Sequence, residues 1–531
     1  MAHGIGHISS LVRAARVFAR YDVVPPAYLE ELPAAARLGQ RLLKLDLPWQ
    51  RADWEARIAG DRGRRLVLAL TELGPSHIKL GQFLATRPDI IGAELAGALT
   101  SLQDRLPPFA QEEALAEVER GLGAPVDTLF TEIGPPVAAA SIAQVHKAHT
   151  REPDGDGMDV AVKVLRPGIE KRFERDLGAF FFIARAVQRF HPPSRRLRPV
   201  EAVETLARSV HLEMDLRMEA AAISEMAENT AKDPGFRVPK VDWQRTSRRV
   251  LTLQWVGSSP LNDIAALEAA GHDLRRLGAT VIQSFLRHAM RDGFFHADMH
   301  QGNLFVDPDG TLVAVDFGIM GRLSPKDRRF LAEILYGFIK RDYTRVAQVH
   351  FDAGYVPRSN SVETFAQALR AIGEPLMDKD AEEISMARLL GQLFHVTEQF
   401  DMQTQPQLLL LQKTMVVVEG VARTLDPKLN MWTTAEPVVE EWMQSKLGPE
   451  GRIQEAAEGA ALLGRLVGGL PELLEGAERV AQVMAAGGGI RLDRETSEAI
   501  AESQVRQGRT GRIALWIGAL ALVVIALAQV F

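Results

Sequence analysis

Residues 295–318 read FHADMHQGNLFVDPDGTLVAVDFG, and the rest of the chain is organised around this stretch. Two short apolar runs, 304–306 and 312–315, flank the sequence Asp-Pro-Asp-Gly at 307–310. Pro followed by Gly between apolar runs is typical of a tight β-hairpin. The hairpin separates an Asp-x4-Asn motif from an Asp-Phe-Gly motif. Each motif alone is common by chance, but together and in this order they predict a kinase-type site.

Three side chains of this stretch suit phosphoryl transfer. That reaction needs a carboxylate near the attacking hydroxyl and oxygen ligands that hold Mg²⁺ against the phosphates. Asp298 suits the first role and is the predicted catalytic carboxylate. Asn303 and Asp316 suit the second, because Mg²⁺ prefers hard oxygen ligands and a hairpin brings both residues to one metal.

The composition narrows the class of protein. A chain of 531 residues holds two to four domains, and shares of 46% hydrophobic and 24% charged residues are ordinary for a folded protein. The net charge of −6 gives no support for nucleic-acid binding. The absence of cysteine excludes disulfides, thiolate metal ligands and a cysteine nucleophile.

An alanine-rich loop precedes the central stretch where a kinase carries a glycine-rich phosphate loop. The predicted nucleotide-binding residues of this loop are Val137, Ala138, Ala139, Ala140, Ser141, Ile142, Ala143, Gln144 and Val145. Small residues allow close approach of the backbone to phosphate, and a serine hydroxyl can donate to it. Alanine reaches positive φ less easily than glycine, so a tightly packed turn is the alternative.

Residues 159–165 alternate as a β-strand does. Val160, Val162 and Val164 fall on one face, and Lys163 falls on the other. The segment resembles the V-A-I-K strand of kinases, whose lysine binds the α- and β-phosphates of ATP. Lys163 is therefore a predicted catalytic and nucleotide-binding residue, although a solvated lysine is the alternative.

A long helical region follows at about 170–231. On one regular helix, Asp215 and Glu219 lie about 40° apart and share a face, whereas Glu213 lies further round. This spacing predicts that Asp215 or Glu219 pairs with Lys163. A solvated charged face is the alternative.

Two further segments bear on the substrate. The apolar strand at 249–257 lies where the two lobes of a kinase are hinged, which predicts adenine contacts with the backbone around Gln254 and Val256. Ser324 followed by proline predicts a new helix soon after Gly318. The chain therefore lacks the long segment with which protein kinases bind peptides, which counts against a peptide substrate.

The two ends of the chain suggest contact with a membrane. Residues 513–531 are uncharged and nearly all apolar, which predicts a transmembrane helix across a layer of about 30 Å, or alternatively a buried helix. Arg506, Arg509 and Arg512 predict that the preceding domain faces the cytoplasm. Residues 5–21 contain three arginines and no acid, and we expect a helix packed on the domain. A membrane-surface helix or a transit peptide is the alternative.

These motifs together resemble the UbiB family of atypical protein-kinase-like proteins, whose members support ubiquinone biosynthesis. The resemblance runs over roughly residues 25–435. The family's K-x-G-Q signature stands at 79–82, its alanine-rich loop at 138–146, its E-x-D at 213–215 and its H-A-D-x-H-x-G-N at 296–303.

The resemblance adds roles that spacing alone does not give. It implies that Lys79, otherwise an ordinary surface lysine, belongs to a helical extension that covers the pocket, and that Glu219 is the partner of Lys163. Glu213 and Asp215 become motif carboxylates. The resemblance also implies Mg²⁺ and ATP as cofactors and attachment to the bacterial inner membrane, with the catalytic domain on the cytoplasmic side. Expected partners are membrane lipid, polyprenyl quinone precursors and ubiquinone biosynthetic enzymes.

The predicted architecture is an α+β, bilobal protein-kinase-like fold with added helical regions and a C-terminal transmembrane helix. Its predicted regions are a helical extension (1–110), an N-lobe with a helical insert (111–256), a C-lobe (257–435), a helical region for which membrane association is one option (436–512) and the membrane span (513–531).

Three functions fit this architecture. The first is an ATP-dependent phosphotransferase or ATPase that acts on quinone precursors or their biosynthetic enzymes. The second is a protein kinase that regulates a ubiquinone-pathway hydroxylase. The third is a non-catalytic module that binds lipid or protein and uses nucleotide as a structural ligand.

Overall fold

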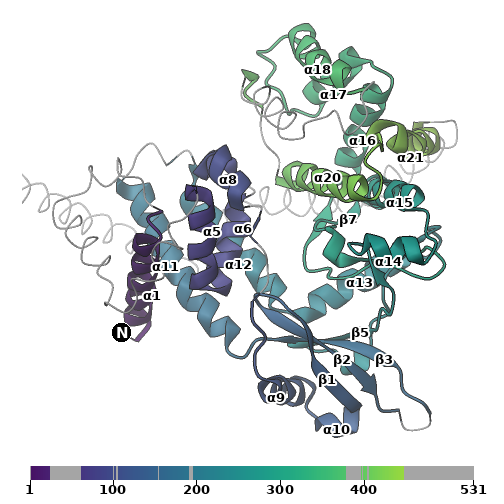
Figure 1. The fold of residues 1–531 in the computed structure, drawn as a ribbon. Helices are drawn as coiled ribbons and strands as arrows, with labels where there is room; N and C mark the ends of the chain where they lie inside the picture. Colours follow the sequence, from purple (N-terminus) through teal and green to yellow (C-terminus); the bar gives the residue numbers. More distant parts are fainter. Residues whose placement is uncertain are drawn as a thin grey trace, which may run out of the picture. The chain divides into compact units, whose positions relative to one another are not determined.

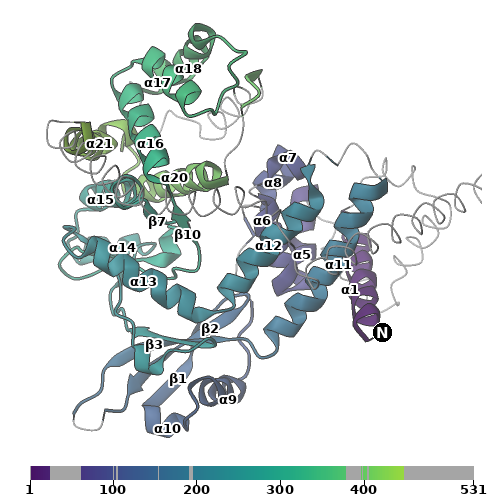
Figure 2. The same cartoon turned by 180° about the vertical axis from the view of Figure 1, so that it is seen from behind.

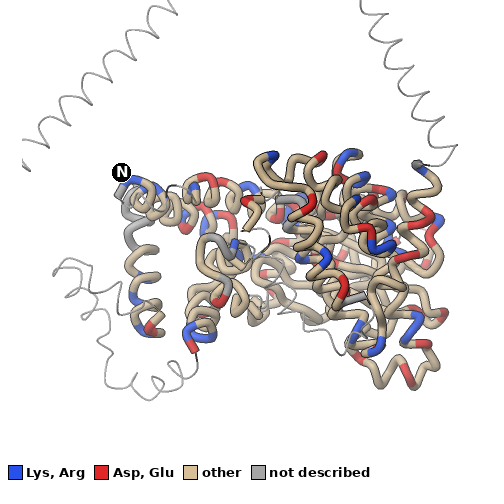
Figure 3. Tube along the Cα trace, turned by 90° about the horizontal axis from the view of Figure 1, so that it is seen from above, with Lys and Arg blue, Asp and Glu red and all other residues tan. Residues whose placement is uncertain are grey.

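The fold was analysed in a computed structural model that describes residues 2–23, 61–85, 87–99, 101–102, 106–152, 155–190, 195, 197–377, 396, 399–402 and 406–447. Lysines and arginines are interspersed with acidic residues along the described chain (Figure 3). This mixture agrees with the small net charge of −6.

A four-stranded antiparallel sheet forms the first lobe (Figure 1). Its strands, in spatial order, are β1 (Phe130–Ala139), β2 (Ala143–Thr150), β3 (Asp159–Leu165) and β5 (Val250–Gln254). The valines at 160, 162 and 164 of β3 are fully buried and pack in a cluster with Phe130 and with Val118 of α9 (Gln111–Leu122). A short helix, α10 (Val126–Leu129), leads into β1. The predicted alternation of β3 is confirmed.

Three helices are inserted between β3 and β5. They are α11 (Ile169–Phe190), α12 (Pro199–Glu213) and α13 (Leu216–Thr230). The expectation of one regular helix through residues 213–219 is wrong, because the chain breaks between α12 and α13. The side chain of Asp215 accepts a hydrogen bond from the backbone N–H of Arg217 and caps α13. Aspartate is favoured at this position because its carboxylate satisfies a free N–H at the helix start.

The N-terminal helices pack on this insert. They are α1 (Ala2–Arg20), α5 (Arg62–Leu73), α6 (Pro75–Ala85), α7 (Pro88–Ile91) and α8 (Ala93–Leu99). Helix α1 lies beside α11 in both views of the ribbon (Figures 1 and 2). Val17 and Tyr21 at the end of α1 are buried against Ala69 and Leu73 of α5. The expected packing of the first helix on the domain is therefore confirmed.

The second lobe is mainly helical around two small sheets. Two short elements precede β5 in the chain: β4 (Phe236–Arg237), which pairs with β9 (Leu312–Ala314), and the 3-10 helix η3 (Trp243–Arg245). The elements that follow β5 are β6 (Ser259–Pro260), α14 (Ile264–Ala269), α15 (Leu274–Arg287), the π-helix η4 (His288–Asp292), β7 (Phe294–His296), η5 (Gln301–Asn303), β8 (Leu304–Val306), β9, β10 (Met320–Arg322), α16 (Pro325–Ile339), α17 (Tyr343–Asp352), α18 (Val362–Met377), α20 (Pro406–Leu425) and α21 (Met431–Leu447). The predicted hairpin is present as β8 and β9, with Gly310 in its turn at φ +85°.

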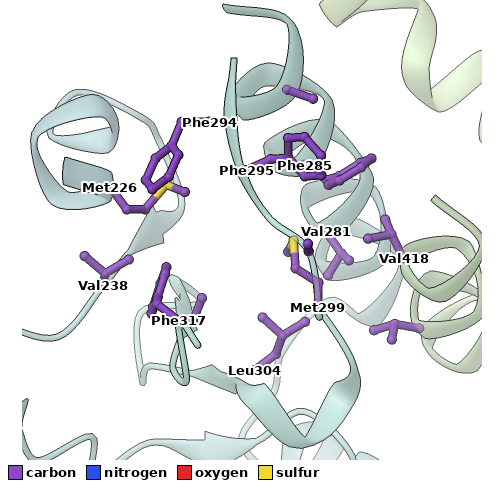
Figure 4. Close-up of a cluster of buried hydrophobic side chains, with 14 of the residues drawn as sticks. Met226, Val238, Val281, Phe285, Phe294, Phe295, Met299, Leu304, Phe317 and Val418 are labelled. Atoms are coloured by element: carbon purple, nitrogen blue, oxygen red, sulfur yellow. The ribbon is translucent and has the colours of Figure 1, made fainter. Parts of the chain in front are cut away.

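The core of this lobe lies between the central stretch and the C-terminal helices. Phe285 of α15 meets Phe295 of β7 edge to face, with 5.6 Å between ring centroids. Met299 and Val418 of α20 belong to the same buried cluster (Figure 4). Phe295 and Met299, which lie on either side of Asp298 in the sequence, thus pack in the same core as α20.

The transmembrane helix predicted at 513–531 is not seen, which corrects the expected architecture. No helix among the residues that the structure describes is long and apolar enough to cross a membrane. Residues 513–531 lie outside that part of the chain, as does 448–512. The apolar helix α20 is long enough at 20 residues, but it contains Lys413, Glu419 and Arg423 and packs in the core.

Candidate active site

Lys163 contacts acidic side chains from two other parts of the chain. Its Nζ lies 2.9 Å from Oε1 of Glu219 and 3.0 Å from Oδ1 of Asp316. Lys163 comes from β3, Glu219 from the first turn of α13, and Asp316 from the stretch after β9. Of the two acids that spacing allowed as partner of Lys163, the fold therefore selects Glu219.

The charges of this group depend on one another. Burial opposes the charge of Lys163, but the carboxylates of Asp316 and Glu219 outweigh it and raise the pKa of Lys163. Burial raises the pKa of Glu219, and Lys163 opposes that shift. Although burial also disfavours its charge, the Lys163 ammonium holds the pKa of Asp316 well below its usual range. The Asp316 side chain is 48% exposed, so one of its edges remains open for a ligand.

Asp316 has an unusual backbone. Its φ of +60° is in the left-handed region, where residues other than glycine are uncommon. Such strain persists only where the surroundings impose it, and it is concentrated at functional sites. The conformation of Asp316 therefore agrees with a ligand-binding role.

The backbone of Asp298 is fixed from several sides. Its N–H donates to Nδ1 of His296 at 3.0 Å, and its carbonyl accepts from Nδ2 of Asn303 at 3.1 Å. Nε2 of His296 in turn donates to the carbonyl of Val315 at 3.1 Å. Burial lowers the pKa of His296, which favours the neutral ring that these two contacts require. Asn303 uses its amide nitrogen here, which leaves its oxygen for a metal.

His296 was missed by the sequence reasoning as a site residue. The only signal was its place two residues before Asp298 in the H-A-D motif. Its function in the fold is to join the segment of Asp298 to the strand that leads to Asp316.

The alanine-rich loop forms the turn between β1 and β2. The backbone N–H of Ala140 donates to the carbonyl of Ala143 at 2.8 Å. Arg166, at the end of β3, donates to the carbonyl of Ala140 from Nε at 3.1 Å and from Nη2 at 2.9 Å. Ser141 is fully buried, and its hydroxyl has no hydrogen-bond partner among the described residues. Sequence reasoning missed Arg166, for which no motif gave a signal.

The other loop residues differ in how available they are to a ligand. Gln144 is fully buried; its Oε1 accepts from the N–H of Phe109 at 2.9 Å and its Nε2 contacts Nε2 of His146 at 2.9 Å. The side chain of Gln144 is thus committed to protein contacts. Val137 on β1 is 54% exposed. Of the two polar side chains in the loop, that of Ser141 is the one without a protein hydrogen bond among the described residues.

The backbone N–H groups at the hinge differ in whether a protein acceptor already binds them. The N–H of Gln254 donates to the carbonyl of Lys240 at 2.8 Å, and that of Trp255 donates to Asp159 at 3.0 Å. Among the described residues, the N–H of Val256 has no protein acceptor. Of the two predicted adenine contacts, Val256 is the one whose backbone donor is available.

Lys79 lies in an ion pair with the first acid of the E-x-D motif. Its Nζ is 2.6 Å from Oε2 of Glu213, and the side chains are 10% and 9% exposed. The positive charge of Lys79 also helps to lower the pKa of Asp316. Lys79 is thus within electrostatic reach of the site, whereas Asp215 pairs with Arg217 at 2.7 Å.

The segment after Gly318 is short, as predicted. Strand β10 pairs directly with β7, and α16 begins at Pro325 with Ser324 as its N-cap. This leaves no long segment of chain between the Asp-Phe-Gly motif and the next helix.

The comparisons with known proteins agree with this geometry. The ABC1 atypical kinase-like domain matches residues 101–350, and the UbiB helical domain matches residues 369–430. A relative in Marinobacter nauticus is 39% identical and covers 97% of this chain and 93% of its own. A relative in Aeromonas hydrophila is 40% identical and covers 85% of this chain and 82% of its own. Both are bacterial proteins named "Probable protein kinase UbiB".

A solved structure supports the fold alone. The complex of Rv3197 with erythromycin from Mycobacterium tuberculosis superposes with a TM-score of 0.52 at 24% identity, over 76% of this chain and 99% of that chain. The bilobal kinase-like architecture is therefore shared with a solved protein. By its motifs, its matched domains and its similarity over nearly the whole length, the chain belongs to the UbiB family of atypical kinase-like proteins.

Proposed function

We propose that the protein is an Mg-ATP-dependent phosphotransferase or ATPase that supports ubiquinone biosynthesis. The observation that carries the proposal is the contact of Lys163 with both Glu219 and Asp316 at about 3 Å. A lysine held in this way is the arrangement with which kinases bind the phosphates of ATP. A protein that used nucleotide only for packing would not require these three charges together.

The residues present fit Mg-ATP. Asn303 and Asp316 would supply two oxygen ligands, and Mg²⁺ usually completes its shell with waters and substrate phosphates. Lys163 would hold the phosphates, the hydroxyl of Ser141 is buried without a partner, and the open N–H of Val256 would receive adenine. When bound, Mg²⁺ neutralises charge on the phosphates as the phosphoryl group transfers.

Asp298 is the residue that would act on the phosphate acceptor. Its side chain is 35% exposed, and its carboxylate lies 3.7 Å from Nε2 of His300. The backbone hydrogen bonds to His296 and Asn303 hold it in place. Asp298 would accept the proton of the attacking hydroxyl or water.

Two features around the site bear on the identity of the phosphate acceptor. The short segment between Gly318 and Ser324 offers no peptide-binding surface of the kinase type, and Lys79 of the N-terminal extension lies within electrostatic reach of Asp316. Both features favour a small acceptor over a peptide. We therefore propose polyprenyl quinone precursors, which reside in membrane lipid, as substrates at the cytoplasmic face of the bacterial inner membrane, in company with ubiquinone biosynthetic enzymes.

A binding module that needs no turnover is the second candidate. The observation that favours it is the alanine turn between β1 and β2, where Ala140 is held by Arg166 and the chain does not use glycine. Such a module would bind Mg-ATP without releasing phosphate.

Phosphate release by the full-length protein tests both candidates. It is measured with Mg-ATP, with and without vesicles that contain a polyprenyl phenol, for wild type, Asp298→Asn and Asp316→Asn. Asp309→Asn is the matched control, because Asp309 lies exposed in the turn of the same hairpin. Turnover that is lost in the first two variants and kept in the control supports the proposed enzyme. Thermal stabilisation by nucleotide without turnover, abolished by Asp316→Asn, supports the binding module.

A further inference from the structure

The peptide that leads into Asp298 is fixed on both sides. The N–H of Ala297 donates to the carbonyl of Ile319 at 3.0 Å, which ties it to the chain beyond Gly318. The carbonyl of Ala297 accepts from Oγ1 of Thr414 at 3.1 Å. Ala297 is 2% exposed and Thr414 is fully buried, so water reaches neither group. The two hydrogen bonds set the direction in which Asp298 leaves the strand.

Thr414 lies far along the chain from the other residues named above that form hydrogen bonds with this segment. His296, Asn303 and Ile319 lie in or near the central stretch, whereas Thr414 lies on α20, within the matched UbiB helical domain. Val418, one turn further along α20, belongs to the buried cluster with Phe295 and Met299, and Figure 4 shows all three side chains in that cluster. Apolar packing thus seats α20 against the segment, and the hydroxyl adds a directional contact.

The proton of the Thr414 hydroxyl has two acceptors within reach. One is the carbonyl of Leu410 at 2.8 Å, and the other is that of Ala297. Leu410 already receives the helical N–H of Thr414, as in any α-helix. Ala297 has no other donor among the described residues, and a buried carbonyl without a donor destabilises the fold. Of the two acceptors, the carbonyl of Ala297 is therefore the one that depends on the Thr414 hydroxyl for its hydrogen bond.

A second contact reaches the same region from the next helix. Nε1 of Trp442 on α21 donates to the carbonyl of Met290 at 2.9 Å. Met290 lies in the π-helix η4, just before β7. A π-helix changes the usual pairing of backbone groups, and such turns are frequent at functional sites. Helices α20 and α21 thus both hold backbone carbonyls of the chain that leads to Asp298.

We propose that Thr414 is a positioning residue for Asp298: its hydroxyl fixes the carbonyl of Ala297 and so places the catalytic carboxylate. The helical domain then supplies a part of the catalytic machinery instead of only covering the lobe. This inference rests on the proposed function, since it assigns Asp298 a reaction to perform. Protein kinases have a long segment after their Asp-Phe-Gly motif, and here a helix from elsewhere in the chain contacts the region in its place.

Steady-state kinetics of the full-length protein test the proposal. Thr414→Val keeps the shape of the side chain and removes the donor. We expect kcat for phosphate release to fall about tenfold with KM for ATP within about twofold, because small displacements of a reacting group are costly whereas nucleotide contacts remain. Thr414→Ser should restore kcat. Thr424→Val is the control, since Thr424 lies on the same helix and donates only within it, to Val421 at 2.7 Å.

Amide hydrogen exchange of residues 294–303 gives a readout that needs no activity. Exchange should rise in Thr414→Val and return to the wild-type level in Thr414→Ser. Unchanged kcat and exchange in Thr414→Val would overturn the inference, as would an equal loss in Thr424→Val or a failure of serine to rescue. If the wild type releases no phosphate, the proposed function fails, and the exchange comparison still decides whether Thr414 fixes the segment.

Discussion

Nζ of Lys79 lies 2.6 Å from Oε2 of Glu213, and the side chains are only 10% and 9% exposed. The pair joins α6 of the N-terminal extension to the last residue of α12. Removing two charges from water is costly, so each is tolerated because the other is present. The pair therefore fixes the extension against the helical insert at a point within electrostatic reach of Asp316.

Breaking this pair from one side should destabilise the fold strongly. In Lys79→Met, the buried carboxylate of Glu213 loses the ammonium that lies 2.6 Å away, and we expect a loss of about 3–5 kcal/mol. The double variant Lys79→Met/Glu213→Gln should recover part of that loss, because the buried negative charge is removed as well. The measurement is urea unfolding followed by fluorescence, analysed as a double-mutant cycle.

An exposed ion pair provides the control for this cycle. Arg198 and Glu201 lie 3.2 Å apart with side chains 72% and 62% exposed, and Arg198→Met should cost less than about 1 kcal/mol. Equal losses in Lys79→Met and Arg198→Met would show that the buried pair does not hold the extension.

Lys163 and Glu219 should differ in how they affect catalysis. Lys163→Met removes the charge that holds the phosphates and Asp316, so kcat/KM for Mg-ATP should fall by about 100-fold or more. Glu219→Gln keeps the shape and one acceptor for Lys163, so the loss should be smaller. Steady-state phosphate release measures both.

Lys147→Met is the matched control for these variants. Lys147 lies on β2 and pairs with Asp159 at 2.7 Å, but both side chains are nearly half exposed. Its removal should leave kcat/KM within about twofold, since an exposed pair is screened by water. A loss in the control as large as that in Lys163→Met would contradict a specific role for Lys163.

Local rules account for the parts of the fold that could be predicted. The hairpin at 304–314, the strand that carries Lys163 and the helix start at Ser324 follow from turn residues, alternation and capping, which act over a few positions. The break between α12 and α13 was missed although Asp215 is a good cap, because the surrounding residues also suit one continuous helix. A capping residue alone does not show whether a helix is continuous or broken, because the tertiary contacts of the two arrangements also contribute.

Contacts between distant segments could not be predicted from spacing. Lys79 looks like a surface lysine until Glu213 is brought to it, and only family resemblance identified it. Arg166 and Thr414 gave no signal at all, because they act by donating to backbone carbonyls, which every residue possesses. The side chains that hold a site in place are therefore harder to find in a sequence than those that bind the ligand.

Arg166 should govern nucleotide affinity without taking part in the reaction. It donates to the carbonyls of Ala140 and Pro107 and so holds the alanine turn, where we expect the phosphates of ATP to bind. Arg166→Gln loses most of these bonds, and we expect the Kd for Mg-ADP to rise about tenfold, since hydrogen bonds from charged donors contribute about 1.5–3 kcal/mol. Isothermal titration measures this. Unchanged affinity would show that the turn keeps its place without the arginine.

Buried His77 should make the stability of the protein depend on pH. Burial lowers its pKa from 6.5 to about 4, with Arg13 and Arg172 acting in the same direction and Asp176 against it. The folded value lies below the unfolded one, so the unfolded chain takes up the proton first as the pH falls. The stability that neutral His77 contributes is thus complete above pH 6.5 and is lost progressively toward pH 4, by up to about 3 kcal/mol at 1.36 kcal/mol per unit.

The variant His77→Phe removes the titrating group but keeps a ring beside Phe180, which His77 contacts edge to face at 5.1 Å. Urea unfolding at pH 7.5, 6.5 and 5.5 should show a smaller fall in stability for His77→Phe than for wild type. The control is His211→Gln, because His211 is exposed on α12 and should leave the wild-type slope unchanged. The same slope in His77→Phe as in wild type would mean that the N-terminal helices open before the ring is protonated, so that His77 titrates in water in both states.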